Sequence, residues 1–147
     1  EDAFTLKFQG PTRLGPAGVA DAFSEVELWW DPAHSYTGDA ANLSLDLAPG
    51  GCWCEAMPDG TRFDHGRVVS DVYGEVRLHA PFGPLRSMAT RADLIVTWSL
   101  ADGVVTPTWT FIVEGPGGGA LAEPVDGVMG DGFARWIAHM DARAAAL

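Results

Sequence analysis

Positive charge is scarce in this chain of 147 residues. Nine Lys and Arg residues, with Lys7 the only lysine, stand against twenty Asp and Glu residues and give a formal net charge of −11. Affinity for nucleic acid comes mainly from cationic contacts to phosphate, and anionic membrane surfaces attract basic segments. The composition therefore argues against a nucleic-acid partner and against membrane binding. It predicts an acidic, well-solvated surface.

Cysteine is nearly absent as well. Cys52 and Cys54 are the only two, which is too few for a disulfide framework. On an extended strand their Cα atoms would lie roughly 6.5 Å apart, close to the limit for a bridge. We therefore expect two buried thiols that pack as small hydrophobic groups.

Several functional signatures are also missing. No segment reaches the ~18–20 continuous apolar residues of a membrane helix, so we expect no insertion into a membrane. The glycine-rich run at 115–119 has no lysine and no strand–loop–helix frame, so it is interpreted as a connector. The chain lacks zinc-ligand spacing and a Gly-x-Ser-x-Gly elbow. We expect no metal, no cofactor and no serine triad.

The composition that remains is that of an ordinary globular protein, with 47% hydrophobic and 20% charged residues. The length suits a single domain over residues 1–147. Apolar and polar residues alternate in short runs bounded by turn signals such as Asp102-Gly103 and Tyr73-Gly74. The predicted strands cover residues 3–9, 43–47, 52–57, 62–72, 75–80, 94–100 and 108–113.

Helical periodicity occurs in two places. Apolar residues recur every three or four positions from Val19 to Trp30, which predicts one helix or two short ones, ended by Asp31-Pro32. A long helix is predicted from about residue 122 to the end of the chain. Short turns between strands favour an antiparallel sheet, and an amphipathic helix of this length must lie on its apolar face. The predicted fold is α+β: a curved antiparallel sheet of about seven strands wrapped on a long C-terminal helix.

Three glycines weaken the first half of the long helix. Gly127, Gly130 and Gly132 each cost ~1 kcal/mol relative to alanine in a helix interior. Their presence in a row indicates either close packing of the helix against a neighbour or a mobile lid.

Five sequence strings spread over nearly the whole chain point to a known family. They are, in order, residues 16–24 (Pro-Ala-Gly-Val-Ala-Asp-Ala-Phe-Ser), Trp29-Trp30, Leu45-Asp46-Leu47 with Pro49-Gly50-Gly51 and Trp53, Gly66-x-Val68-Val69, and the Thr-rich strand 104–115. In this order they resemble the SRPBCC (START-like, helix-grip) superfamily, in the branch of the heat-shock-protein ATPase activator homologues and polyketide cyclase-like proteins. The chain departs from that pattern at 25–28, where the family often has an Asp-Pro turn.

The resemblance implies a hydrophobic cavity between the sheet and the terminal helix. Members of the superfamily bind lipids, sterols, polyketides and other apolar molecules, and some are cyclases or other enzymes. The implied partner is therefore a hydrophobic small molecule, held by a monomer or a weak homodimer. A start at Glu1, a single lysine and the leader peptides of relatives favour an exported or periplasmic protein over a cytoplasmic one, although a trimmed chain would look the same.

Large aromatic and methionine side chains on the predicted inward faces are the candidate ligand-binding residues. A cavity lined by such groups with a few polar ones is typical of a small-molecule site. For each residue the alternative is a plain place in the core. The candidates are Trp30, Trp53, Trp98, Trp109, Phe111, Met129, Phe133, Trp136 and Met140.

The loop at 31–39 holds the densest group of polar side chains. His34 with Asp31 or Asp39 could form an acid–base pair, and Tyr36 could donate a hydrogen bond to a ligand oxygen. The alternative is that these side chains cap the local backbone. Asp64 and His65 are neighbours on a strand, so they face opposite sides and cannot form a dyad, and we expect them at the surface.

These observations favour the binding or transport of an apolar small molecule over catalysis. The first alternative is an enzyme of the cyclase or hydratase type that acts on a bound hydrophobic substrate, with His34 or Asp39 as the base. A more remote alternative is a co-chaperone of a heat-shock ATPase, which the acidic surface disfavours.

Overall fold

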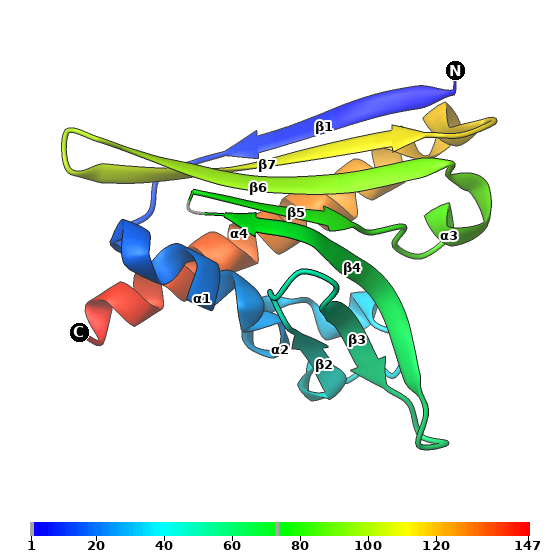
Figure 1. Ribbon diagram of the computed structural model, residues 1–147, viewed down its shortest axis with the longest axis horizontal. Helices are drawn as coiled ribbons and strands as arrows, with labels where there is room; N and C mark the ends of the chain where they lie inside the picture. Colours follow the sequence, from blue (N-terminus) through cyan, green and yellow to red (C-terminus); the bar gives the residue numbers. More distant parts are fainter. Residues whose placement is uncertain (1, 73) are drawn as a thin grey trace.

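An antiparallel sheet of seven strands forms the frame of the computed structural model, which describes residues 2–72 and 74–147 (Figure 1). The strand order is β1-β7-β6-β5-β4-β3-β2, so the first strand lies beside the last. The strands are β1 (Ala3–Gln9), β2 (Leu43–Leu45), β3 (Cys52–Ala56), β4 (Arg62–Val72), β5 (Glu75–His79), β6 (Arg91–Ala101) and β7 (Val104–Glu114). The turn predicted at Tyr73-Gly74 includes Tyr73, which lies outside the described residues.

The described helices lie on and around this sheet (Figure 1). Two short helices follow β1 and both contact the long C-terminal helix, which runs across the sheet, while the second of them also contacts β2 (Figure 1). The helices are α1 (Val19–Ser24), α2 (Val26–Trp29), α3 (Leu85–Met88) and α4 (Ala122–Ala145), with 3-10 turns at Pro16–Gly18, Pro32–His34, Ala40–Asn42 and Gly118–Leu121. The predicted α+β architecture, a curved antiparallel sheet on a long C-terminal helix, is confirmed.

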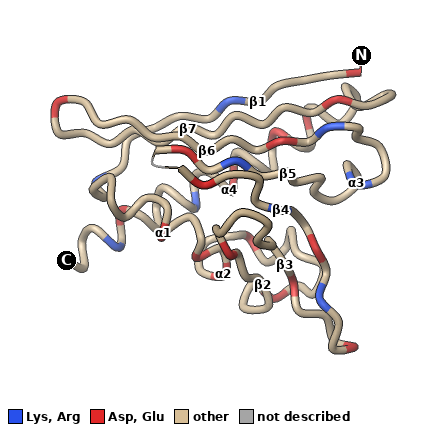
Figure 2. Tube along the Cα trace, in the orientation of Figure 1, with Lys and Arg blue, Asp and Glu red and all other residues tan. Residues whose placement is uncertain are grey.

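Two details of the helices were not settled by the sequence. The segment after β1 breaks at Glu25, whose backbone leaves the helical region, so the alternative of two short helices is confirmed. α3 was not predicted, because a four-residue helix is too short to show periodicity. None of the described helices is long and apolar enough to cross a membrane. Asp and Glu residues are spread along the whole trace (Figure 2).

Register shifts bend the sheet on the side of β2 to β4. One lies between Trp53 and Cys54 in β3, and another lies between Val68 and Ser70 in β4. Such bulges increase the local twist and bend the strand, and β4 curves away from the rest of the sheet (Figure 1). The prediction for the two cysteines of β3 is also corrected. Cys52 and Cys54 form a disulfide with their Cα atoms 5.3 Å apart, closer than on a regular strand, so the expectation of two thiols was wrong.

Aromatic rings fill the space under the middle of α4. Trp136 of α4 stacks on Trp109 of β7 with ring centroids 5.6 Å apart. Phe23 of α1 meets both rings edge-on, at 6.0 Å from Trp109 and 5.4 Å from Trp136. All three side chains are fully buried. Offset-stacked and edge-to-face pairs of this kind stabilise beyond the area that they bury.

The glycines of α4 serve close packing at two of three positions. A Cβ atom on Gly132 would lie 2.8 Å from the Trp30 ring, and one on Gly130 would lie 3.2 Å from Phe8. A Cβ on Gly127 would meet nothing within 4 Å. The missing side chain of Gly132 therefore allows α4 to approach Trp30.

Alanine substitutions at two of these glycines test this packing. Gly132→Ala forces the Trp30 ring or the helix to shift, and we expect the free energy of unfolding to fall by about 1–3 kcal/mol. Gly127→Ala is the matched control, and its gain in helix propensity should raise the same quantity by about 0.5–1 kcal/mol. Urea unfolding measures both, and equal stabilities of the two variants would contradict the close approach of α4.

Candidate functional site

A cavity of about 340 Å³ lies beside the first half of α4. Its walls come from residues 30 and 33–36, from the strands β2, β3, β4 and β7, from the segment at 82–85 and from the helix itself. Most of the lining is apolar, and the larger apolar side chains are Trp30, Trp53, Phe82, Leu85, Phe111 and Met129. The hollow therefore lies at the end of the helix away from the stacked Trp109 and Trp136 rings.

The predicted ligand-binding residues divide between this cavity and the solid core. Trp30, Trp53, Phe111 and Met129 line the cavity. Five others do not line it: Trp98, Trp109, Phe133, Trp136 and Met140. Four of them pack within the core, and Trp98 is a partly buried residue at its edge. Periodicity identifies the buried face of an element, but it does not show whether that face meets side chains or a hollow.

The polar loop at 31–39 contributes one side of the cavity. His34, Ser35 and Tyr36 line it. Asp39 instead accepts a hydrogen bond from the Ala41 backbone N–H at 3.0 Å, and it does not line the cavity. This residue follows the alternative interpretation of local backbone capping, and it is not positioned as a base for a ligand.

Asp31 also caps backbone, and His34 is only loosely paired with it. Asp31 accepts from the Ala33 backbone N–H at 2.9 Å, and this bond is the chief reason that its pKa is lowered. The nearest nitrogen of His34 lies 3.8 Å from a carboxylate oxygen of Asp31, on a side chain that is 37% exposed. The structure thus does not assemble the predicted acid–base pair into a buried unit.

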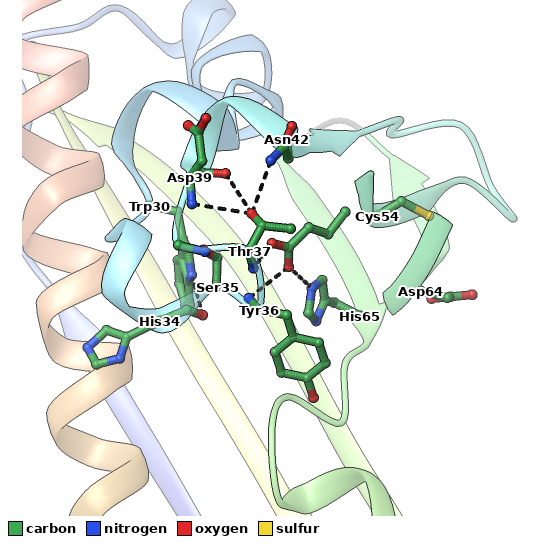
Figure 3. Close-up of polar contacts among 12 residues, drawn as sticks. Trp30, His34, Ser35, Tyr36, Thr37, Asp39, Asn42, Cys54, Asp64 and His65 are labelled. Carbon is green, nitrogen blue, oxygen red and sulfur yellow. Dashed lines mark hydrogen bonds and ion pairs between the residues drawn. The ribbon is translucent and has the colours of Figure 1, made fainter. Parts of the chain in front are cut away.

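A buried pair that the sequence did not single out stands at the polar end of the cavity. Glu55 of β3 is fully buried, and its Oε1 lies 2.8 Å from Nε2 of His65 on β4 (Figure 3). The backbone N–H groups of Tyr36 and Thr37 donate to the same carboxylate at 3.1 and 2.7 Å. His65 is 6% exposed and lines the cavity.

The environment of Glu55 keeps its carboxyl group ionised. Burial opposes the charge, but the hydrogen bonds from Thr37, His65 and Tyr36 outweigh it and lower the pKa of Glu55 to about 2. An ionised carboxylate only accepts hydrogen bonds. We therefore assign the Nε2 proton to His65 from the hydrogen-bond network.

His65 corrects a second expectation. Asp64 and His65 do face opposite sides of β4 (Figure 3). Asp64 pairs with Arg67 at the surface. His65, however, is buried, because its side of the strand faces the cavity and the Glu55 carboxylate. The sequence did contain a signal for Glu55. This residue lies two positions after Trp53, whose side chain points inward, and on a strand that spacing places both side chains on the same buried face.

Asp31, His34 and Asp131 are the group of possible metal ligands within the described ranges, and their ligand atoms lie within 4.8 Å of one another. Arg135 contacts both carboxylates, at 3.4 Å from Asp31 and 2.8 Å from Asp131. A guanidinium group already compensates the negative charge there, so this cluster does not resemble a site built for a cation.

No family model and no curated protein matches the chain. Solved structures match over nearly its whole length. An uncharacterised protein from Rhizobium leguminosarum has a TM-score of 0.67 at 18% identity and covers 95% of both chains. Major latex-like protein 151 from Panax ginseng has a TM-score of 0.60 at 17% identity, over 98% of this chain and 99% of that one.

A third solved structure matches this chain with only about half of its own length. The di-domain ARO/CYC StfQ from the steffimycin biosynthetic pathway has a TM-score of 0.63 at 10% identity, over 98% of this chain and 52% of that one. At such identities the likeness shows the fold alone. The predicted helix-grip fold is confirmed at that level.

Protonation of Glu55 supplies a test of the buried pair. The lowered pKa means that the ionised carboxylate stabilises the folded state above pH ~4.5, and that this contribution is lost as the pH falls towards about 2. At neutral pH we expect wild type to be more stable than Glu55→Gln. The difference in free energy of unfolding should shrink by up to about 3 kcal/mol on acidification to pH ~2.

Urea unfolding of both proteins across this pH range measures the difference, and the other carboxylates cancel because both proteins contain them. A difference that stays constant with pH would contradict the ionised, hydrogen-bonded state of Glu55.

Proposed function

We propose that this protein binds an apolar small molecule in the cavity between the sheet and α4. The observation that carries the proposal is the cavity of about 340 Å³, because its walls are mainly aromatic and aliphatic with a few polar groups at one end. That volume falls in the lower part of the range of ~300–1,000 Å³ for small-molecule pockets. Each Å² of apolar ligand surface removed from water would contribute about 25 cal/mol before the costs of association.

The lining supports a ligand with an aromatic or ring-shaped body. Trp30 and Trp53 lie edge-on with centroids 5.2 Å apart, and Phe82 packs against both rings. Met129 adds a flexible side chain that adapts to irregular apolar shapes. One solved structure of the same fold comes from the steffimycin biosynthetic pathway, which is consistent with a small-molecule ligand.

The enzymatic alternative rests on different residues from those first considered. Asp39 caps the backbone and His34 is partly exposed, so neither supplies a buried base. His65, hydrogen-bonded to Glu55, is the group in the cavity that is positioned to accept a proton. A cyclase or hydratase reaction would therefore depend on His65, with Glu55 as its positioning residue.

A cavity-filling substitution tests the binding proposal. Val128 of α4 lines the cavity, and Val128→Trp places an indole into the space that a ligand needs. We expect wild type to bind the uncharged fluorescent probe N-phenylnaphthylamine, and the variant to bind it at least about tenfold more weakly, a loss of ~1.4 kcal/mol or more.

Val69→Trp is the matched control, because Val69 is 57% exposed on β4 and away from the cavity. Thermal unfolding checks that both variants are folded. Equal affinity in the two variants would contradict the assignment of this cavity. Failure of wild type to bind the probe, sterols, fatty acids or flavonoids would contradict the proposed function itself.

A further inference from the structure

The Glu55 carboxylate has a fixed position and a fixed charge. Two of its hydrogen bonds come from consecutive backbone N–H groups, those of Tyr36 and Thr37, which cannot rotate away as side chains can. The third comes from His65 Nε2 at 2.8 Å. A buried acceptor held in this way selects one tautomer of the neutral imidazole, with the proton on Nε2.

The consequence is a free acceptor on the other ring nitrogen. In this tautomer Nδ1 of His65 carries a lone pair, and Nδ1 has no hydrogen-bond partner in the described part of the chain. The ring lines the cavity and packs against Tyr36 and Phe63, with centroids 5.0 and 4.9 Å away. The side chain is 7% exposed, so a ligand that fills the cavity would take the place of water at this acceptor.

The other polar side chains of the cavity, those of Ser35, His34 and Tyr36, do not offer such an acceptor, and Tyr36 is 50% exposed. Ser35 Oγ donates to the Pro32 carbonyl at 2.7 Å and accepts from the Gly38 N–H at 3.0 Å. The His34 side chain is 37% exposed, so water can satisfy it. Among the described side chains that line the cavity, His65 is therefore the buried one with an unpaired acceptor nitrogen.

We propose that this end of the cavity is a subsite for the hydroxyl group of a phenol or an enol, which donates its hydrogen bond to His65 Nδ1. This proposal rests on the proposed function and names the chemical class of the ligand. It follows from the pairing of an aromatic-lined hollow with one buried acceptor, since a phenol or enol combines a flat apolar body with a single strong donor.

The same arrangement can move a proton. When the hydroxyl is acidic enough, its O–H bond breaks and an N–H bond forms at Nδ1, which leaves the electron pair on the ligand oxygen. The imidazolium then lies between that oxyanion and the Glu55 carboxylate, and both stabilise its charge. No group other than the ligand and these two residues takes part.

A pair of probes that differ only in the donor tests the subsite. The fluorescent phenol 2-naphthol offers an O–H group, and its methyl ether keeps the ring system and the oxygen without that proton. We expect wild type to bind the naphthol about five- to tenfold more tightly than the ether, the effect of one hydrogen bond to a buried acceptor. The preference should vanish in His65→Leu and persist in His79→Leu, a matched control at an exposed histidine.

Each outcome of the titration decides a different point. Binding of both probes with equal affinity to wild type would overturn the hydroxyl subsite and leave the apolar binding site intact. Binding of neither naphthyl probe would overturn the subsite, and it would overturn the proposed function as well when N-phenylnaphthylamine also fails to bind. A preference that survives in His65→Leu would place the donor contact elsewhere and reject His65.

The tautomer can be measured without any ligand and without a variant. Long-range proton–nitrogen correlation spectra distinguish an imidazole protonated at Nε2 from one protonated at Nδ1. We expect His65 of the free protein to carry its proton on Nε2, as Glu55 dictates. A ring protonated at Nδ1 alone would overturn the proposal even if His65→Leu failed to fold.

Discussion

The stacking of Trp136 on Trp109 fixes where α4 lies against the sheet, and the rest of the structure depends on it. The two rings, with Phe23 wedged edge-on against both, fill one part of the space between helix and sheet completely. Gly132 then lets the helix approach the Trp30 ring. Because the helix is anchored there, its first half spans β3, β4 and α3 without filling the space below, and this space is the cavity.

The second constraint is the Glu55 network, which joins three segments that are distant in the sequence. The carboxylate holds the loop at Tyr36 and Thr37, and it holds His65 of β4 against β3. Burying a carboxylate is costly, and the hydrogen bonds that compensate for it make the geometry around it specific. This network places one histidine at the polar end of an apolar hollow, so a single interaction contributes to both the fold and the chemistry of the site.

The strands and the long helix could be predicted because their signals are local. β1 was predicted with its observed bounds from the alternation of Phe4, Leu6 and Phe8, and the terminal helix from its apolar stripe. The site was harder, because it depends on which buried faces meet a hollow. Trp53 and Trp109 have the same pattern in the sequence, yet one lines the cavity and the other fills the core. The disulfide between Cys52 and Cys54 left no signal in their spacing, because their Cα atoms lie 5.3 Å apart, closer than on a regular strand.

The central claim is that α4 covers a hollow at one end and a solid core at the other, and two of its methionines report on the two ends. Met129 lines the cavity, whereas Met140 is fully buried in the core. With the methionine methyl groups labelled with ¹³C, intermolecular NOEs can be recorded from bound N-phenylnaphthylamine. The account predicts NOEs to the methyl group of Met129 and none to that of Met140. NOEs to Met140, or bound probe with no NOE to Met129, would contradict it.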